Sequence, residues 1–277
     1  MKVTINSFIN FLTLVSILAN AQSTLTADKF IVVEGKKVHY QTGGAGKTTV
    51  VFESGYGDDL GSWNAIYSEV AKFAKVIRYD RDGLGKSESL DPNLQSKNFK
   101  QIATRLHTIL KKANQQPPYV LVGHSFGGSV IRAFAFLYPK EVVGLVFVDP
   151  QNEYNGSELT QEQRQNNREI ATMDSIMKSN PTLSGRNYEW EIAKSEYING
   201  YAELISFSDL PNVPTALFVA GAGGLKSGLR KLYENKMKQL SVAYFIEVAQ
   251  SDHYVHNYEP LLVIENIKRI VFPSAKK

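Results

Sequence analysis

Six short segments of largely apolar residues constrain the fold of this chain more than any other feature. They are Thr48–Phe52, Lys75–Tyr79, Tyr119–Val122, Val143–Val148, Thr215–Ala220 and Val242–Val248. Strands without polar alternation are typical of parallel sheets that are covered on both faces. Segments with apolar residues every three or four positions separate them and predict helices. The sequence therefore predicts an α/β protein with a mostly parallel central sheet flanked by helices.

The same periodicity predicts where the helices lie. The expected helices are Leu60–Phe73, one from Phe99 that ends near residues 115–118, Phe126–Tyr138 before Pro139, and a last one through Leu261, Ile264, Ile267, Ile270 and Val271. Near the start of the chain, Phe30–Val33 and Lys37–Gln41 flank Glu34-Gly35-Lys36, which predicts a hairpin.

Composition and charge exclude several classes of function. A hydrophobic content of 43% rules out a disordered chain. The 31 Lys and Arg residues exceed the 27 Asp and Glu residues by only four and form no basic run, so we expect no nucleic-acid partner. The chain has no Cys, which excludes a disulfide scaffold, a thiol nucleophile and a thiolate metal site.

Residues 1–21 have the pattern of a secretory signal peptide. Lys2 precedes an apolar stretch, Ile9–Leu18, and Ala19-Asn20-Ala21 follows as a small-residue cleavage site. The apolar stretch is shorter than the roughly 20 residues that cross a bilayer, so we expect no stable membrane anchor. The prediction is a secreted or periplasmic protein, with a buried N-terminal helix as the alternative.

A long insertion divides the rest of the chain. Residues 151–210 lie between two buried strands and are too many for an ordinary crossover. We interpret them as a helical cap on a core made of residues 22–150 and 211–277. Its large side chains either face a pocket or dock the cap on the core; they are Tyr188, Trp190, Tyr197, Tyr201 and Phe207.

Gly123-His124-Ser125-Phe126-Gly127 carries the chemistry. It follows a predicted strand and begins a predicted helix, which is the context of a nucleophile elbow. Such a turn is sharp and requires small residues two positions on either side of the nucleophile. Ser125 would stand at a helix N-terminus, where free N–H groups and the helix dipole favour a developing oxyanion. A structural glycine-rich turn is the alternative.

A serine nucleophile needs a base, and the chain has five histidines. His39 lies in the predicted hairpin, His107 on the expected outward face of its helix, and His124 next to Ser125, from which it should point away. His253 and His256 follow the last strand, in a loop that emerges at the same sheet edge as the elbow. His253 is nearer to the strand end and is the predicted base, with His256 as the alternative.

With these motifs the sequence resembles the α/β-hydrolase superfamily, in particular its small secreted esterase-like members. The resemblance rests on Val51–Gly57, Tyr79–Ser87, Gly123–Gly127, Val146–Pro150 and Asp252–Tyr254. It implies the α/β-hydrolase fold with a helical cap inserted between two late strands, and the chain order nucleophile, acid, histidine.

The resemblance also implies an oxyanion hole formed by the backbone amides of Tyr56 and Phe126. Many family members have His-Gly before the first of these donors, whereas this chain has Ser54-Gly55. The donor is a backbone group, so the difference does not remove it.

The catalytic acid is harder to place. Most of the family has it after the strand that corresponds to Thr215–Ala220, but residues 221–228 contain no carboxylate. Some members have it one strand earlier, where this chain has Asp149, which is therefore the predicted acid. A role in the turn before Pro150 is the alternative for Asp149, and Asp209 and Asp252 are the alternative acids.

These residues together predict a serine hydrolase that cleaves a small-molecule carboxylic ester through an acyl-enzyme intermediate. The same triad would serve a lactonase, thioesterase or perhydrolase, and a non-catalytic ligand-binding homologue is the rival from another class. The sequence indicates no oligomeric state.

No motif predicts a cofactor or a metal. Gly43–Thr48 ends like a phosphate-binding loop but joins two strands, so we expect a hairpin-like turn. Gly221-Ala222-Gly223 lacks the third glycine of a dinucleotide site. Asp80, Asp82 and Glu88 lie around a glycine-rich turn and are expected to be solvated there.

Overall fold

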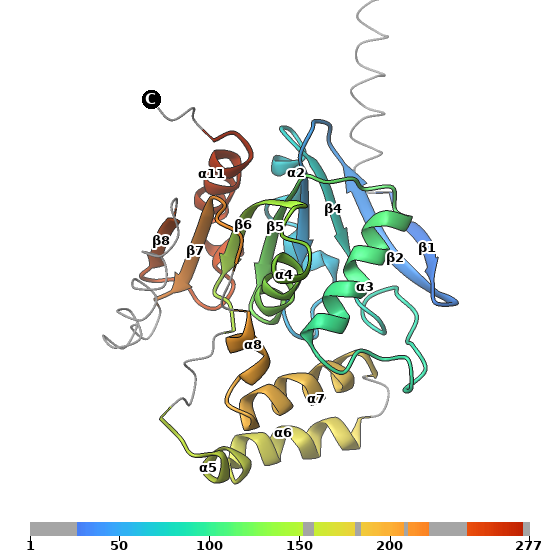
Figure 1. Cartoon of the computed structure of the whole chain (residues 1–277), viewed down its shortest axis with the longest axis vertical. Coiled ribbons are helices and arrows are strands. Elements are labelled where there is room, and N and C mark those ends of the chain that lie inside the picture. The colour runs from blue at the N-terminus through green and yellow to red at the C-terminus, as the bar shows by residue number, and fades with distance from the viewer. Residues whose placement is uncertain (1–26, 152–157, 181–183, 208–209, 222–242, 274–277) are drawn as a thin grey trace, which may run out of the picture.

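The computed structural model describes residues 27–151, 158–180, 184–207, 210–221 and 243–273 of the chain. Within these residues, one sheet has the strand order β1-β2-β4-β3-β5-β6-β7-β8 (Figure 1). Its strands are β1 (Lys29–Val33), β2 (Lys36–Gly43), β3 (Thr49–Glu53), β4 (Lys75–Tyr79), β5 (Tyr119–His124), β6 (Val142–Val148), β7 (Thr215–Ala220) and β8 (Ala243–Val248). Strands β3 to β8 are all parallel, and β2 is antiparallel to β1 and β4. The predicted α/β class is confirmed.

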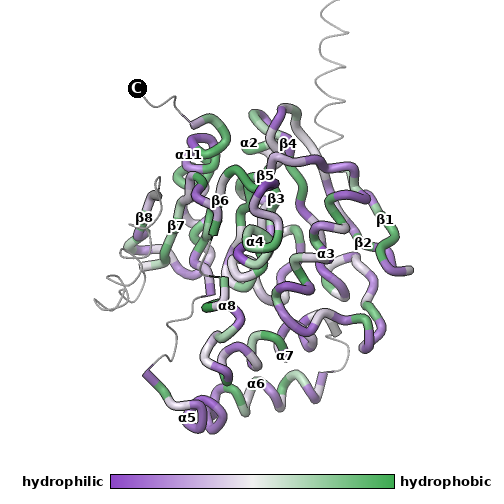
Figure 2. The backbone as a smooth tube through the Cα atoms, in the orientation of Figure 1, coloured by the Kyte–Doolittle hydropathy of each residue, from purple (hydrophilic) through white to green (hydrophobic). Residues whose placement is uncertain are grey.

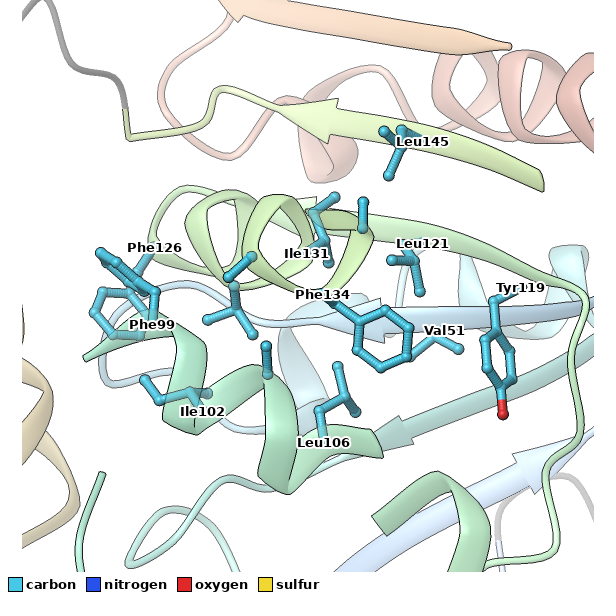
Figure 3. Close-up of a cluster of buried hydrophobic side chains, with 14 of the residues drawn as sticks. Val51, Phe99, Ile102, Leu106, Tyr119, Leu121, Phe126, Ile131, Phe134 and Leu145 are labelled. Carbon is cyan, nitrogen blue, oxygen red and sulfur yellow. The ribbon is translucent and has the colours of Figure 1, made fainter. Parts of the chain in front are cut away.

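Helices cover both faces of the sheet. α3 (Phe99–Lys112) and α4 (Phe126–Leu137) pack on one face, while α2 (Tyr67–Val70) and α11 (Pro260–Val271) pack on the other. The alternating direction of side chains along a strand divides the core between these layers. In β3, Val51 belongs to the first cluster, whereas Val50 and Phe52 belong to the second. Figure 3 shows Val51 with Phe134 of α4 in the first cluster.

The cap helices follow β6 and precede β7 in the sequence. They are α5 (Gln161–Gln165), α6 (Arg168–Ser179), α7 (Ser184–Ile198) and α8 (Ala202–Ser206). Figure 1 shows them beyond one end of the sheet, below α4. In Figure 2, α5 is mostly hydrophilic, and none of its side chains is buried.

The large side chains of the cap mostly dock it. Tyr188, Tyr201 and Phe207 belong to the buried cluster that also contains α3 and α4. Trp190 Nε1 donates to Asp174 of α6 at 3.0 Å, so it joins two cap helices to each other. These contacts favour the docking interpretation over a pocket lining.

One predicted helix is wrong in detail. The expected helix Leu60–Phe73 is a 3₁₀ turn, η1 (Leu60–Trp63), followed by the single turn α2. The reason lies in tertiary contacts, because the Leu60 amide donates to Asp80 and the Leu60 carbonyl accepts from Arg78. The predicted last helix is confirmed as α11, although its Leu261 side chain is 73% exposed. The predicted last strand is confirmed as β8, which pairs with β7 among the described strands and has an exposed Tyr244.

The connection from β2 to β3 is not the expected hairpin-like turn. Strand β4 lies between these two strands in the sheet. The loop instead packs against the residues before β4, where a Cβ atom on Gly44 would lie 1.9 Å from the Ala74 carbonyl oxygen. Gly44 has a φ of 68°, which also requires glycine.

The predicted signal peptide, residues 1–21, lies outside the described residues. Among the helices that the structure does describe, none combines the length and the apolar character that crossing a membrane requires.

Candidate active site

Ser125 occupies the sharp turn between β5 and α4. Its φ of 50° and ψ of −117° are strained for a residue with a side chain, and it is the N-cap of α4. Neighbouring backbone holds this conformation. The Ser125 amide donates to the Val148 carbonyl at 3.1 Å, and the Ser125 carbonyl accepts from the amides of Gly128 and Gln151 at 2.9 and 3.0 Å. The turn is therefore fixed by the end of β6 as well as by its own helix.

The two glycines of the motif are required by close packing. A Cβ atom on Gly127 would lie 2.3 Å from the Glu53 carbonyl oxygen and 2.5 Å from that of Ser54. A Cβ atom on Gly123 would lie 2.6 Å from the Gly127 carbonyl oxygen. The first turn of α4 therefore lies directly against the end of β3, and this contact leaves room for no side chain.

The structure brings His253 and Asp149 together. His253 Nδ1 lies 2.6 Å from Asp149 Oδ2, and Asp149 Oδ1 accepts from the Ala220 amide at 3.0 Å. Asp149 directly follows β6, and its φ of 42° is again in the left-handed region. The carboxylate is therefore held on both oxygens, one by the end of β7 and one by the imidazole. The His253 side chain remains 49% exposed.

His253 and Ser125 come from different loops, and no hydrogen bond joins their side chains in this structure. The residue next to Ser125 connects the two loops. His124 Nε2 donates to the His253 carbonyl at 2.9 Å, and the two imidazole rings are 4.6 Å apart. Burial, together with the nearby His256 and His253, lowers the pKa of His124 to about 2, so His124 is neutral. His124 thus holds the loop that contains His253 against the turn at Ser125.

The alternative residues make other contacts. His256 is fully buried, and its Nε2 donates to the Ser62 carbonyl at 3.1 Å. Its ring lies 4.4 Å from that of Trp63, and burial lowers its pKa to about 4. Asp252 accepts from the Tyr254 amide at 2.9 Å and so caps its own loop. Asp209 lies outside the described residues.

The amides of Tyr56 and Phe126 lie beside adjacent strands. Tyr56 follows β3, Phe126 begins α4 after β5, and Glu53 of β3 pairs with Gly123 of β5. Neither amide donates to another group in the described part of the chain. Free amides at a helix N-terminus and in a neighbouring loop are the arrangement that stabilises an oxyanion.

A buried ionic cluster adjoins this loop, and sequence reasoning gave it no role. Arg81, the second residue after β4, lies between Glu53 at the end of β3 and Glu189 of the cap helix α7. Both carboxylate side chains are completely buried. The sequence offered one signal, since Glu53 and Arg81 are charged residues at the ends of buried strands. Nothing in it pointed to Glu189, which is 108 residues from Arg81.

Two predictions about polar residues near the sheet are wrong. His107 does not face outward, because α3 packs it on Tyr138, the C-cap of α4, with ring centroids 3.8 Å apart. Asp80 and Asp82 are buried rather than solvated. Asp80 Oδ2 lies 2.6 Å from His39 Nδ1, and Asp82 accepts from Arg105 at 2.5 Å. Asp80 also accepts from the amides of Leu60 and Lys86, so these carboxylates hold the loop after β4. Glu88 accepts from the Lys37 amide at the surface.

No group of three or more potential metal ligands is found among the residues that the structure describes.

Comparison with known proteins identifies the relatives of this chain. A family model described as the alpha/beta hydrolase fold matches residues 48–196, more than half of the chain. An uncharacterized Bacillus subtilis protein, YqjL, is 24% identical over 242 residues, which are 85% of this chain and 88% of that protein.

Two solved structures have similar folds at low sequence identity. The epoxide hydrolase CorEH superposes with a TM-score of 0.64 at 16% identity, over 89% of this chain and 99% of that one. Est816, described as an N-acyl homoserine lactone degrading enzyme, gives a TM-score of 0.61 at 16% identity, over 87% and 99% of the two chains.

Proposed function

The chain belongs to the α/β-hydrolase family, and we propose that it is a serine hydrolase that cleaves a small-molecule carboxylic ester. The observation that carries this proposal is the pairing of His253 with Asp149 in a loop that His124 fastens to the strained turn at Ser125. A strained serine at a helix N-terminus and an oriented imidazole at the same sheet edge are the parts that acyl transfer needs.

The first half of the reaction would acylate the enzyme. Ser125 Oγ attacks the carbonyl carbon of the ester, and His253 Nε2 takes its proton. Asp149, bound to Nδ1, keeps the imidazole in the tautomer whose Nε2 accepts, and it stabilises the imidazolium that forms. The amides of Tyr56 and Phe126 bind the oxyanion of the tetrahedral intermediate. His253 then donates its proton to the leaving alcohol, and the ester C–O bond breaks.

The second half would release the acid. Water enters, His253 removes a proton from it, and the resulting hydroxide attacks the acyl carbon. A second tetrahedral intermediate forms in the same oxyanion hole. It collapses with the proton returned to Ser125 Oγ, which regenerates the enzyme.

Lactone hydrolysis is the second candidate within the same machinery. A lactone is a cyclic ester, so the steps are identical and only the pocket differs. The solved structure of Est816, which is described as a lactone-degrading enzyme, shares the fold. An N-acyl homoserine lactone therefore belongs in the same assay as linear p-nitrophenyl esters.

Two variants test the proposal. We expect Ser125→Ala to lower kcat on p-nitrophenyl butyrate by about 10⁴- to 10⁶-fold, because the nucleophile is lost. Asp149→Asn should lower kcat by about 10³- to 10⁴-fold, because the imidazole loses its orienting anion. Asp252→Asn is the matched control and should retain kcat within about threefold, because Asp252 caps its own loop.

A wild-type chain that is inert to linear esters and lactones, and that a fluorophosphonate probe does not label, would contradict the proposal and favour a ligand-binding protein. Full activity in Asp149→Asn together with an inactive Ser125→Ala would contradict the assignment of the acid alone.

A further inference from the structure

The Arg81 guanidinium holds the backbone of the loop that contains Tyr56. Nη1 donates to the Ser54 carbonyl at 2.7 Å and Nη2 to the Gly55 carbonyl at 2.5 Å. Nη1 also reaches Glu53 at 2.6 Å, and the Arg81 side chain is 3% exposed. A planar guanidinium that donates to several fixed acceptors has little freedom to reorient.

The cap holds the other side of the same loop. Glu189 of α7 accepts from Arg81 Nε at 2.5 Å through Oε1 and from the Gly57 amide at 2.7 Å through Oε2. Arg186, one turn earlier in α7, donates to the Gly57 carbonyl at 3.3 Å. One cap helix thus contacts both the amide and the carbonyl of Gly57.

These contacts fix the direction of the Tyr56 amide. The Gly55 carbonyl and the Tyr56 N–H belong to one planar trans peptide unit, so they point in opposite directions. Because Arg81 binds the carbonyl, the N–H must point away from Arg81. The next peptide unit, between Tyr56 and Gly57, is fixed through the Gly57 amide by Glu189. Tyr56 therefore lies between two anchored peptide planes.

We propose that Arg81 and Glu189 are positioning residues that orient the oxyanion donor of Tyr56, so that docking of the cap completes the oxyanion hole. This inference rests on the proposed function. A catalytic effect of Glu189 then requires no contact with substrate, because the carboxylate acts through the Tyr56–Gly57 backbone. Preorganised donors stabilise the transition state more than the bound ester, so the effect should be on kcat.

The main variant is Glu189→Gln, which keeps the shape of the side chain and removes its charge. We expect kcat on p-nitrophenyl butyrate to fall about 10- to 100-fold, less than the loss from deleting an oxyanion donor. KM should stay within about threefold. The loss should be the same for acetate, butyrate and octanoate esters, because the contact does not involve the acyl chain. Inhibition by phenylboronic acid, which forms a tetrahedral adduct, should weaken by a similar factor.

Glu203→Gln is the matched control. Glu203 is also a cap carboxylate that accepts from core backbone amides, those of Phe99 and Lys100 at 2.9 and 3.1 Å. It joins α8 to α3 and makes no hydrogen bond to residues 54–57 in the described part of the chain. We expect its kcat to stay within about twofold of the wild type. An equal loss in both variants would mean that any loosening of the cap lowers the rate, and would overturn the proposal.

A readout that does not depend on turnover separates this inference from the proposed function. Hydrogen exchange of the peptide that contains residues 54–58 should be at least about tenfold faster in Glu189→Gln and unchanged in Glu203→Gln. Unchanged exchange in both variants, or an unchanged kcat in folded Glu189→Gln, would overturn the inference even if Ser125→Ala is inactive. If the wild type hydrolyses no ester, the proposed function fails. The exchange measurement still decides whether Glu189 holds the backbone of residues 54–58.

Glu189→Gln leaves the buried charge of Arg81 with one fewer anionic partner, which can prevent the variant from folding. If Glu189→Gln does not fold, Glu189→Asp retains the charge for Arg81 but shortens the reach to Gly57 by one carbon. The same fall in kcat and the same faster exchange are expected from it. A kcat and an exchange rate equal to those of the wild type in Glu189→Asp would count against the proposal.

Discussion

The body of the sheet and its carboxyl edge are built by different physical means. In the body, every residue of β3 is buried, and the apolar side chains alternate between two clusters. At the edge, Ser125 and Asp149 have positive φ, and Arg81 and Glu189 form a buried ion pair. Apolar burial is not directional and tolerates small shifts, whereas the edge depends on directed contacts and strained backbone. Apolar packing therefore stabilises the body of the sheet, whereas directed polar contacts and strained backbone hold the residues of the candidate site at its carboxyl edge.

The largest expected effect tests the body of the sheet. Phe134 of α4 is fully buried, with its ring 4.9 Å from Tyr138 and 5.9 Å from Tyr119. Phe134→Ala should lower the free energy of unfolding by about 3–5 kcal/mol, measured by urea denaturation, because it leaves a cavity. Under native conditions kcat should stay within about threefold. The control is Leu261→Ala, an exposed site, where we expect less than about 0.5 kcal/mol. A comparable loss at Leu261 would contradict the division between core and surface.

Acid should destabilise the edge through its buried histidines. The unfolded chain protonates His256 near its ordinary pKa of 6.5, whereas in the folded state burial lowers this pKa to about 4. Between these values the unfolded state binds more protons, so the free energy of unfolding falls as pH falls. His256 alone accounts for about 3 kcal/mol by pH 4. His124, which faces His256 at 4.8 Å, adds to the loss.

The test compares the wild type with His256→Gln by urea denaturation from pH 7 to pH 4. We expect the free energy of unfolding of the variant to depend less steeply on pH, by about 1 kcal/mol per pH unit between pH 6 and 4.5. Equal slopes for the two proteins would show that His256 is not held neutral by burial.

The smallest expected effect concerns strain at the elbow. Ser125 has a φ of 50°, and Ser125→Gly removes the side chain that makes this conformation strained. The strain energy that is released, about 1–3 kcal/mol, exceeds the entropic cost of ordering a glycine on folding. We expect the free energy of unfolding to rise by about 1 kcal/mol while activity is lost. The same substitution four residues later, Ser129→Gly in the interior of α4, should lower it by about 0.5–1 kcal/mol. Changes of the same sign in both variants would mean that the turn stores no strain.

Sequence patterns predicted the strands well because each buried strand is a short run of apolar residues that can be recognised in the sequence. The predicted β4 and β7 have the observed bounds, and the elbow lies between β5 and α4 as its glycines indicated. Helices near the surface were less predictable. Residues 60–73 have helical periodicity but form two short turns, and Leu60 makes tertiary contacts instead: its amide donates to Asp80 and its carbonyl accepts from Arg78. Leu261 fits the apolar pattern of α11, yet nothing in the described structure covers it.

The candidate site divides in the same way. Ser125 and His253 could be singled out because each follows a recognisable strand, and parallel strands bring their carboxyl ends to one edge. Asp149 was predicted only through the resemblance to family members that have the acid after the strand that corresponds to β6. The ion pair between Arg81 and Glu189 beside the loop of residues 54–57 could not be predicted, because a charged pair of this kind has no sequence spacing that identifies it.

The sequence by itself determined which segments form strands, that the sheet is mostly parallel and covered on both faces, and the turn that carries Ser125, since each leaves a pattern in residues that are close together in the chain. Only the tertiary structure decided which charges are buried and paired. Glu53, Arg81 and Glu189 meet across three separate segments, and their pairing depends on the strand order β4-β3-β5 and on the docking of α7. Burial of a charge is stable only where its partner is already in place, and the position of the partner is a property of the folded chain.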